Sequence, residues 1–101
     1  MAKTRVGVVQ MTSRGEVDAN LAAAERLVAE AAGEGARLVV LPECFAYLGP
    51  EEGKLAIAEP LPDGGPILAR CQGWAREHGV ELVLGGFWER GAAPSHVRNA
   101  C

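Results

Sequence analysis

The sequence feature that most constrains this chain is the apolar run Leu38-Val39-Val40-Leu41, which is followed at once by Pro42 and Glu43. An unbroken run of strand formers predicts a strand that is covered on both faces. Pro42 ends this strand, because proline has no amide hydrogen to donate to the next bond of the ladder. Open α/β sheets bind their ligands at the carboxyl ends of such strands. The sequence therefore predicts a desolvated carboxylate at a ligand crevice, where Glu43 would act as a general base.

The residues before this strand predict one strand-helix-strand unit over residues 5–42. Residues 5–11 carry branched and long apolar side chains, which suit a first strand. A helix follows, with Asp18 as its expected N-cap, although Ser13 and Glu16 also fit a capping box. Its apolar side chains recur every three or four positions, which predicts a helix that covers the sheet: Val17, Leu21, Ala24, Val28 and Ala31. A helical connection within one sheet makes the two strands parallel.

The middle of the chain, residues 44–65, shows neither the helical nor the strand period and holds many glycines and prolines. We expect a long functional loop here that passes close to Glu43, with a short helical turn near residues 51–58. Pro66 is typical of the first residue of a helix, and Gly79 is typical of the residue that ends one. The sequence therefore predicts a second helix between these two positions.

A third strand is predicted over residues 80–84, and it leads into the pair Gly85-Gly86. The pair is not followed by the lysine and hydroxyl residues of a phosphate-binding loop, so we interpret it as a close backbone approach beside the candidate base. Residues 90–96 predict a polar turn, and residues 97–101 predict the start of a fourth strand. The two aromatic side chains after the glycine pair are expected in the core: Phe87 and Trp88.

Composition limits the class of protein. A chain of 101 residues is the size of one small domain. Its residues are 49% hydrophobic but only 5% aromatic, which favours layered α/β packing of small aliphatic side chains. The net charge of -3 comes from charges spread along the chain, and no basic face or polybasic segment is present. We therefore expect no binding to nucleic acid or to a membrane surface.

The cysteines and the start of the chain indicate the compartment. Three cysteines without Cys-x-x-Cys spacing favour a reducing environment over a disulfide framework or a zinc site. The apolar segment near the start of the chain is too short for a secretory signal, and no transmembrane segment is expected. We expect a cytoplasmic protein.

Cys44 and Lys54 are the side chains near the candidate base that invite a catalytic role. Neighbouring residues on extended backbone point to opposite sides, so we expect Cys44 to face away from Glu43 and to pack in the core. Cys71 and Cys101 are likewise expected to be packing groups. Lys54 follows two glutamates in the loop, and we interpret it as a solvated charge.

Five segments together resemble the nitrilase superfamily of carbon-nitrogen hydrolases. They are Val8-Val9-Gln10-Met11, Asn20-Leu21, the residues 35–43, the residues 79–86, and Asn99. Their order and separation make the resemblance specific, whereas any one of them alone is weak. Within the superfamily, Leu41-Pro42-Glu43-Cys44-Phe45 is most similar to Nit-type amidases, which act on deaminated glutathione or on omega-amides of dicarboxylic acids.

The resemblance implies a fold and a mechanism. Residues 1–101 would be an incomplete carbon-nitrogen hydrolase domain, namely the N-terminal part of the family's α/β fold, which is a nitrilase-like α-β-β-α sandwich. Members of the family use a glutamate, a lysine and a cysteine nucleophile. Glu43 matches the glutamate, whereas the lysine and the cysteine are expected after Cys101. The substrate would be a small amide or nitrile, no metal or organic cofactor is implied, and the protein would form a homo-oligomer or depend on the C-terminal part.

Other interpretations stay open at this point. By its position alone, Glu43 fits equally well as a carboxylate that accepts a backbone amide or pairs with an arginine. Asn99 matches the family pattern, but it also suits the start of a strand. The whole chain could instead be a noncatalytic α/β interaction module or a truncated, inactive gene product, because missing strands would leave a sheet edge and apolar faces exposed.

Overall fold

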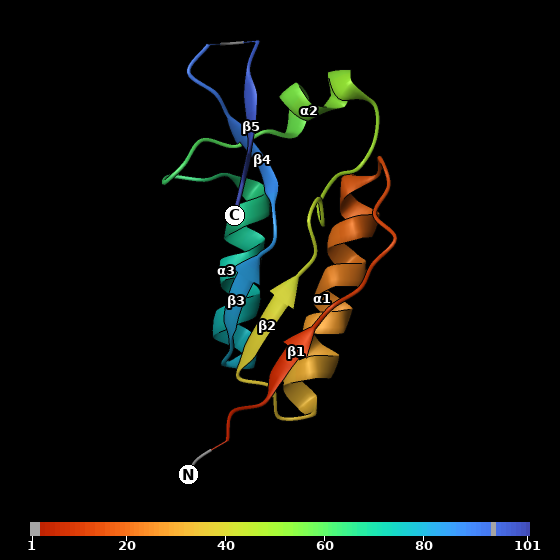
Figure 1. The fold of residues 1–101 in the computed structure, drawn as a ribbon, viewed down its shortest axis with the longest axis vertical. Coiled ribbons are helices and arrows are strands. Elements are labelled where there is room, and N and C mark those ends of the chain that lie inside the picture. Colours follow the sequence, from red (N-terminus) through yellow and green to blue (C-terminus); the bar gives the residue numbers. More distant parts are fainter. Residues whose placement is uncertain (1–2, 94) are drawn as a thin grey trace.

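The computed structural model describes residues 3–93 and 95–101, which form an α/β fold with two sheets (Figure 1). The elements in chain order are β1 (Val6–Val8), α1 (Val17–Gly33), β2 (Leu38–Leu41), α2 (Glu51–Ile57), α3 (Pro66–His78), β3 (Glu81–Leu84), β4 (Phe87–Arg90) and β5 (Val97–Ala100). This order confirms the predicted strand-helix-strand unit, the loop with its short helix, and the second helix followed by strands.

The larger sheet has the order β1-β2-β3, and all three strands are parallel. The apolar run Leu38–Leu41 is therefore its central strand, as expected. Val39 and Leu41 are fully buried, and they belong to one core cluster with the buried side chains of α1 and α3. Parallel strands bring their carboxyl ends to the same edge, so the end of β2 lies beside the end of β3.

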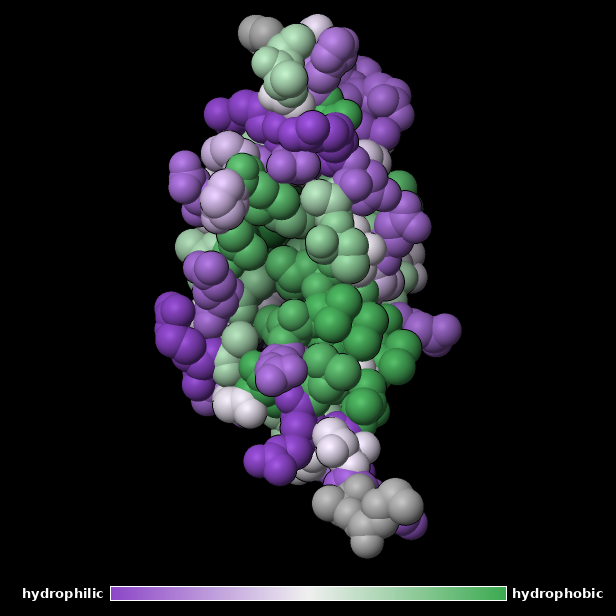
Figure 2. Space-filling model, turned by 60° about the vertical axis from the view of Figure 1, so that its left-hand side comes forward, coloured by the Kyte–Doolittle hydropathy of each residue, from purple (hydrophilic) through white to green (hydrophobic). Residues whose placement is uncertain are grey.

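The opposite face of this sheet is open among the described residues. Val6 and Val8, which pair with Leu38 and Val40 of β2, remain 49% and 76% exposed. Figure 2 shows apolar side chains gathered across the middle of one face of the molecule. The prediction of a central strand covered on both faces is thus wrong for the described part of the chain, because both long helices lie on one side of the sheet.

The start of α1 differs from the expected cap. The helix begins at Val17 after Glu16, no side chain caps it, and Asp18 lies in its first turn instead. The negative charge of Asp18 still suits the amino end of the helix dipole. The buried Asn20 organises this region, because its side-chain amide donates to the carbonyls of Arg14 and Ala46, at 2.8 Å and 2.9 Å.

The C-terminal strands form a separate sheet. β4 and β5 pair antiparallel, with Trp88 opposite Asn99, so the predicted fourth strand does not extend the parallel sheet. The glycine pair between β3 and β4 turns the chain away from the larger sheet. Phe87 is buried as expected, whereas Trp88 is only half-buried. Pro94, in the predicted turn, lies outside the described residues.

A buried glutamate in the loop holds the start of α3. Glu59 is 4% exposed, and its carboxylate accepts the amide hydrogens of Ile67 at 2.6 Å and Leu68 at 3.0 Å. These amides belong to the first turn, where no carbonyl within the helix is available to them. A Cβ at Gly65 would lie 2.9 Å from Cδ of Glu59, so the residue before the helix has to be small. Glu59 therefore acts as a distant cap for α3.

Replacing Glu59 with alanine is expected to lower the free energy of unfolding by about 2 kcal/mol, because one buried and one partly buried amide lose a charged acceptor. Urea unfolding followed by circular dichroism measures the change. Glu52→Ala is the matched control, since Glu52 is exposed on α2. Equal stability of the Glu59→Ala variant and the parent protein would contradict the capping role.

Candidate functional site

The carboxyl end of β2 is in direct backbone contact with the glycine pair. The amide of Cys44 donates to the carbonyl of Gly86 at 2.9 Å. A Cβ at Gly85 would lie 2.2 Å from the carbonyl oxygen of Leu41 and 2.7 Å from the carbonyl carbon of Pro42. Only glycine leaves room for an approach this close. The interpretation of Gly85-Gly86 as a close backbone approach beside Glu43 is thereby confirmed.

Glu43 and Asn99 meet above this glycine pair, although they are 56 residues apart in the sequence. Nδ2 of Asn99 donates to Oε1 of Glu43 at 2.7 Å. A Cβ at Gly86 would lie 2.6 Å from Oδ1 of Asn99 and 3.2 Å from Cγ of Glu43. The turn after β2, the glycine pair and β5 thus bring one carboxylate and one amide together.

The expected desolvation of Glu43 is not found. Its side chain is exposed, at the turn that follows the end of β2. Among residues 3–93 and 95–101, its carboxylate accepts no backbone amide and forms no ion pair, so neither of the structural alternatives applies there. Its partner is the amide of Asn99.

Cys44 differs from the expectation in conformation and in burial. Its φ of 57° is left-handed rather than extended, and its side chain is half-buried rather than in the core. Burial raises the pKa of the Cys44 thiol, the charge of Glu43 raises it further, and Lys54 opposes them. The thiol therefore stays protonated at neutral pH, which argues against Cys44 as a nucleophile.

The other two cysteines lie away from this site. Cys71 is in the core on α3, as predicted, and burial is the main reason that its pKa is raised to about 12. The charge of Glu59 adds to this shift and Arg70 opposes it. Cys101 is exposed, so its prediction as a packing group is wrong.

An electrophilic thiol probe at pH 7.5 is expected to label Cys101 first, Cys44 slowly, and Cys71 only after unfolding. Raised pKa values leave little thiolate at this pH, so labelling of Cys44 should speed up as the pH is increased. Mass spectrometry of timed samples gives the order, with Cys101→Ser as the control. Labelling of Cys44 as fast as Cys101 at neutral pH would show that Cys44 is an activated thiol.

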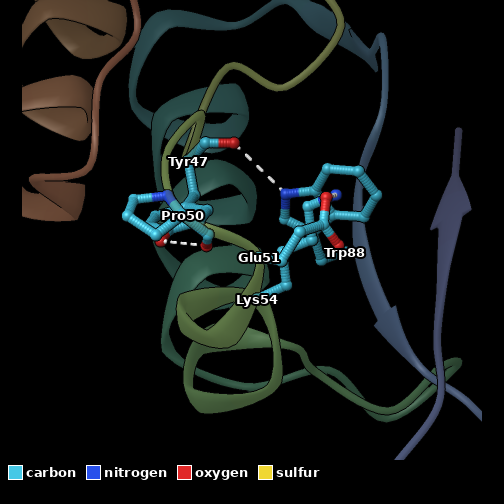
Figure 3. A network of polar contacts seen from close by, with 5 residues as sticks. All are labelled: Tyr47, Pro50, Glu51, Lys54 and Trp88. Atoms are coloured by element: carbon cyan, nitrogen blue, oxygen red, sulfur yellow. Dashed lines mark hydrogen bonds and ion pairs between the residues drawn. The ribbon is translucent and has the colours of Figure 1, made fainter.

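Lys54 takes part in a contact network rather than lying in solvent (Figure 3). Its Nζ is 2.6 Å from Oε1 of Glu51 and 4.1 Å from the centre of the Trp88 ring, and its side chain is only 17% exposed. Nε1 of Trp88 donates to the carbonyl of Tyr47 at 3.2 Å, and the Tyr47 hydroxyl donates to the carbonyl of Pro50 at 2.7 Å. The network fixes α2 and the preceding loop against β4. The predicted solvation of Lys54 is therefore wrong, whereas its expected position near its acidic neighbours is confirmed by the contact with Glu51.

Two hollows lie near the ends of these elements. One of about 460 Å³ lies at the carboxyl end of β1, lined by Val9, Gln10, Met11, Thr12 and Pro42, next to the turn that carries Glu43. Another of about 520 Å³ lies at the start of α3, and Glu59 is one of the residues that line it. The first is the one that adjoins the predicted site, because ligands of parallel sheets bind at the carboxyl ends of the strands.

The part of the chain that the structure describes shows neither a metal-binding cluster nor a membrane-spanning helix. Within residues 3–93 and 95–101, His, Cys, Asp and Glu side chains do not gather in threes close enough to hold a metal ion. No helix in this part of the chain has the length and the apolar character needed to cross a membrane.

Comparison with known proteins now decides the family. The sequence model of the carbon-nitrogen hydrolase family matches residues 5–101, which is nearly the whole chain. The chain belongs to the carbon-nitrogen hydrolase family. The resemblance drawn from the sequence motifs is therefore confirmed.

Relatives of this carbon-nitrogen hydrolase chain are amidases by name. It is 42% identical to human deaminated glutathione amidase over 87 residues, which covers 85% of this chain and 26% of the relative. It is 56% identical to the omega-amidase NIT2 of Danio rerio over 46 residues, which covers 45% of this chain and 16% of the relative. The chain thus spans about a quarter of the human protein's length.

A solved structure supports the fold. The NitFhit protein of C. elegans superposes on 93% of this chain with a TM-score of 0.82 and 27% sequence identity, and the match covers 23% of that protein. The nitrilase-like α/β fold predicted from the sequence is confirmed by this match.

Proposed function

We propose that this chain is an incomplete carbon-nitrogen hydrolase domain. It would be the N-terminal part of an amidase in which Glu43 is the general base. The observation that carries the proposal is the position of Glu43 at the carboxyl end of the central strand, with its carboxylate held beside Gly86. The relatives named as amidases support amide substrates over nitriles. Deaminated glutathione and omega-amides are small molecules that carry carboxylates, so we propose a substrate of that class.

In the proposed reaction, Glu43 takes the proton of a cysteine thiol supplied by residues after Cys101. The sulfur attacks the amide carbon, and the C–N bond breaks as Glu43 returns the proton to the nitrogen, so that ammonia or an amine leaves. Glu43 then takes a proton from water, which hydrolyses the thioester, releases the acid and restores the thiol. A lysine, also supplied by residues after Cys101, would stabilise the negative charge that develops on the oxygen. Neither a metal nor an organic cofactor is needed.

Hydrolysis of deaminated glutathione, which releases a peptide amine, and of omega-amides of dicarboxylic acids, which releases ammonia, tests the proposal in the full-length protein that carries these residues. We expect turnover of at least one of these amides, and a thioester intermediate in the mass spectrum of rapidly quenched samples. Absence of C–N bond hydrolysis for every amide and nitrile tested, with a folded full-length protein, would overturn the proposal.

The open face of the larger sheet exposes Val6 and Val8. Under the same proposal, this face is covered by other parts of the enzyme or by a second copy in a homo-oligomer. The free cysteines Cys44, Cys71 and Cys101 fit a reducing compartment, and we propose the cytoplasm.

A noncatalytic interaction module is the second candidate function, and the open apolar face of the larger sheet is the observation that favours it. A folded full-length protein that binds a partner without amide turnover would support that candidate.

A further inference from the structure

The side chain of Asn99 has one hydrogen bond among the described residues, and its partner is Oε1 of Glu43 at 2.7 Å. Asn99 lies in β5 at a position that is otherwise exposed. Asparagine is a poor strand former, so neither burial nor strand propensity explains it there. The contact with Glu43 is the interaction in the structure that requires an amide donor at position 99.

The backbone fixes Asn99 relative to Glu43 from two sides. The pairing of β5 with β4 sets Asn99 opposite Trp88, which is the second residue after the glycine pair. The absence of a side chain at Gly86 leaves the space in which the amide and the carboxylate meet. The hydrogen bond occupies Oε1 of Glu43, so Oε2 remains available to take a proton.

We propose that Asn99 is a positioning residue that holds the Glu43 carboxylate in its reactive orientation. This inference rests on the proposed role of Glu43 as the general base. A glutamate side chain at an exposed turn has several rotamers, and a general base has to lie within hydrogen-bond reach of the proton that it removes. The amide of Asn99 selects one rotamer and leaves one carboxylate oxygen free.

Two substitutions in the full-length enzyme test the proposal: Asn99→Ala removes the donor, and Asn99→Asp keeps the shape but replaces the donor with a like charge. For Asn99→Ala, we expect kcat for amide hydrolysis to fall about tenfold, because a hydrogen bond to a charged group is lost. Asn99→Asp should lose at least as much, because the two carboxylates repel each other. KM should stay unchanged in both variants, since Asn99 acts on the base and not on substrate binding.

Arg98→Ala is the matched control, because Arg98 is its neighbour on β5 and is exposed, and its ion pair with Glu89 at 3.3 Å is separate from Glu43. It should keep the parent kcat. The proposal is overturned if Asn99→Asp, the variant of the same shape, retains the parent kcat, or if Arg98→Ala loses as much kcat as the two Asn99 variants.

Glu43→Gln in the same assay separates the positioning role of Asn99 from the general-base role of Glu43. If Glu43→Gln abolishes turnover while both Asn99 variants remain active, only the positioning role fails, whereas full activity of Glu43→Gln removes the proposed function itself.

Discussion

Replacing Glu43 with glutamine is expected to reduce amide turnover by the full-length enzyme about a thousandfold, since general acid-base catalysis contributes a factor of about 10²–10⁴. Glutamine has nearly the size of glutamate, and its Oε1 still accepts a hydrogen bond from Nδ2 of Asn99. The variant should therefore keep the fold and the turn after β2. It cannot take the proton of a thiol, so the loss should fall on kcat.

The steady-state rate of amide hydrolysis measures this effect, and the unfolding midpoint shows that the variant is folded. Glu81→Gln is the matched control, because Glu81 is exposed and lies in β3 at the opposite, amino edge of the same sheet, where it pairs with Leu38. We expect this control to turn over like the parent enzyme. Retention of more than about a tenth of the parent kcat by Glu43→Gln would exclude the general-base role.

The elements of the larger sheet were predictable because their signals are local. The apolar period of α1 and the apolar run Leu38–Leu41 are patterns of neighbouring residues. The same holds for the ends of α3, which starts at Pro66 and ends at Gly79, where φ is 64° and left-handed. Proline at a first helical position and glycine after a last one act through the φ that each allows. These features are set within a few residues of sequence, so the pattern of residue types predicted them.

The contacts that build the candidate site depend on distant parts of the chain, and the sequence did not predict them. Nothing near Glu43 in the sequence indicates that Asn99 will meet it, and nothing near Lys54 indicates the ring of Trp88. The exposure of Glu43 was also wrongly predicted, since burial depends on which elements cover the sheet and not on the strand itself. Glu59 has a sequence signal, because a carboxylate shortly before Pro66 in a loop of prolines and glycines can accept the free amides at the start of the helix.

Replacing Gly85 with alanine is expected to lower the free energy of unfolding by about 3 kcal/mol, because an added methyl group in a filled space costs about 1–3 kcal/mol and the neighbours here are backbone. The Cβ would lie 2.2 Å from the carbonyl oxygen of Leu41 and 3.0 Å from the amide nitrogen of Glu43. Neither atom can rotate away as a side chain does. The turn that carries Glu43 would therefore have to move, and amide turnover should fall together with stability.

Gly73→Ala is the matched control for this substitution. Gly73 lies inside α3, and a Cβ at this position would meet no other atom within 4 Å. Alanine is the better helix former, so the control should raise stability by about 1 kcal/mol. Chemical unfolding of both variants against the parent protein measures the two opposite changes. A Gly85→Ala variant as stable as the parent would show that the turn at Glu43 leaves space for a Cβ at position 85. That result would contradict the close backbone approach between β2 and Gly85 on which the candidate site depends.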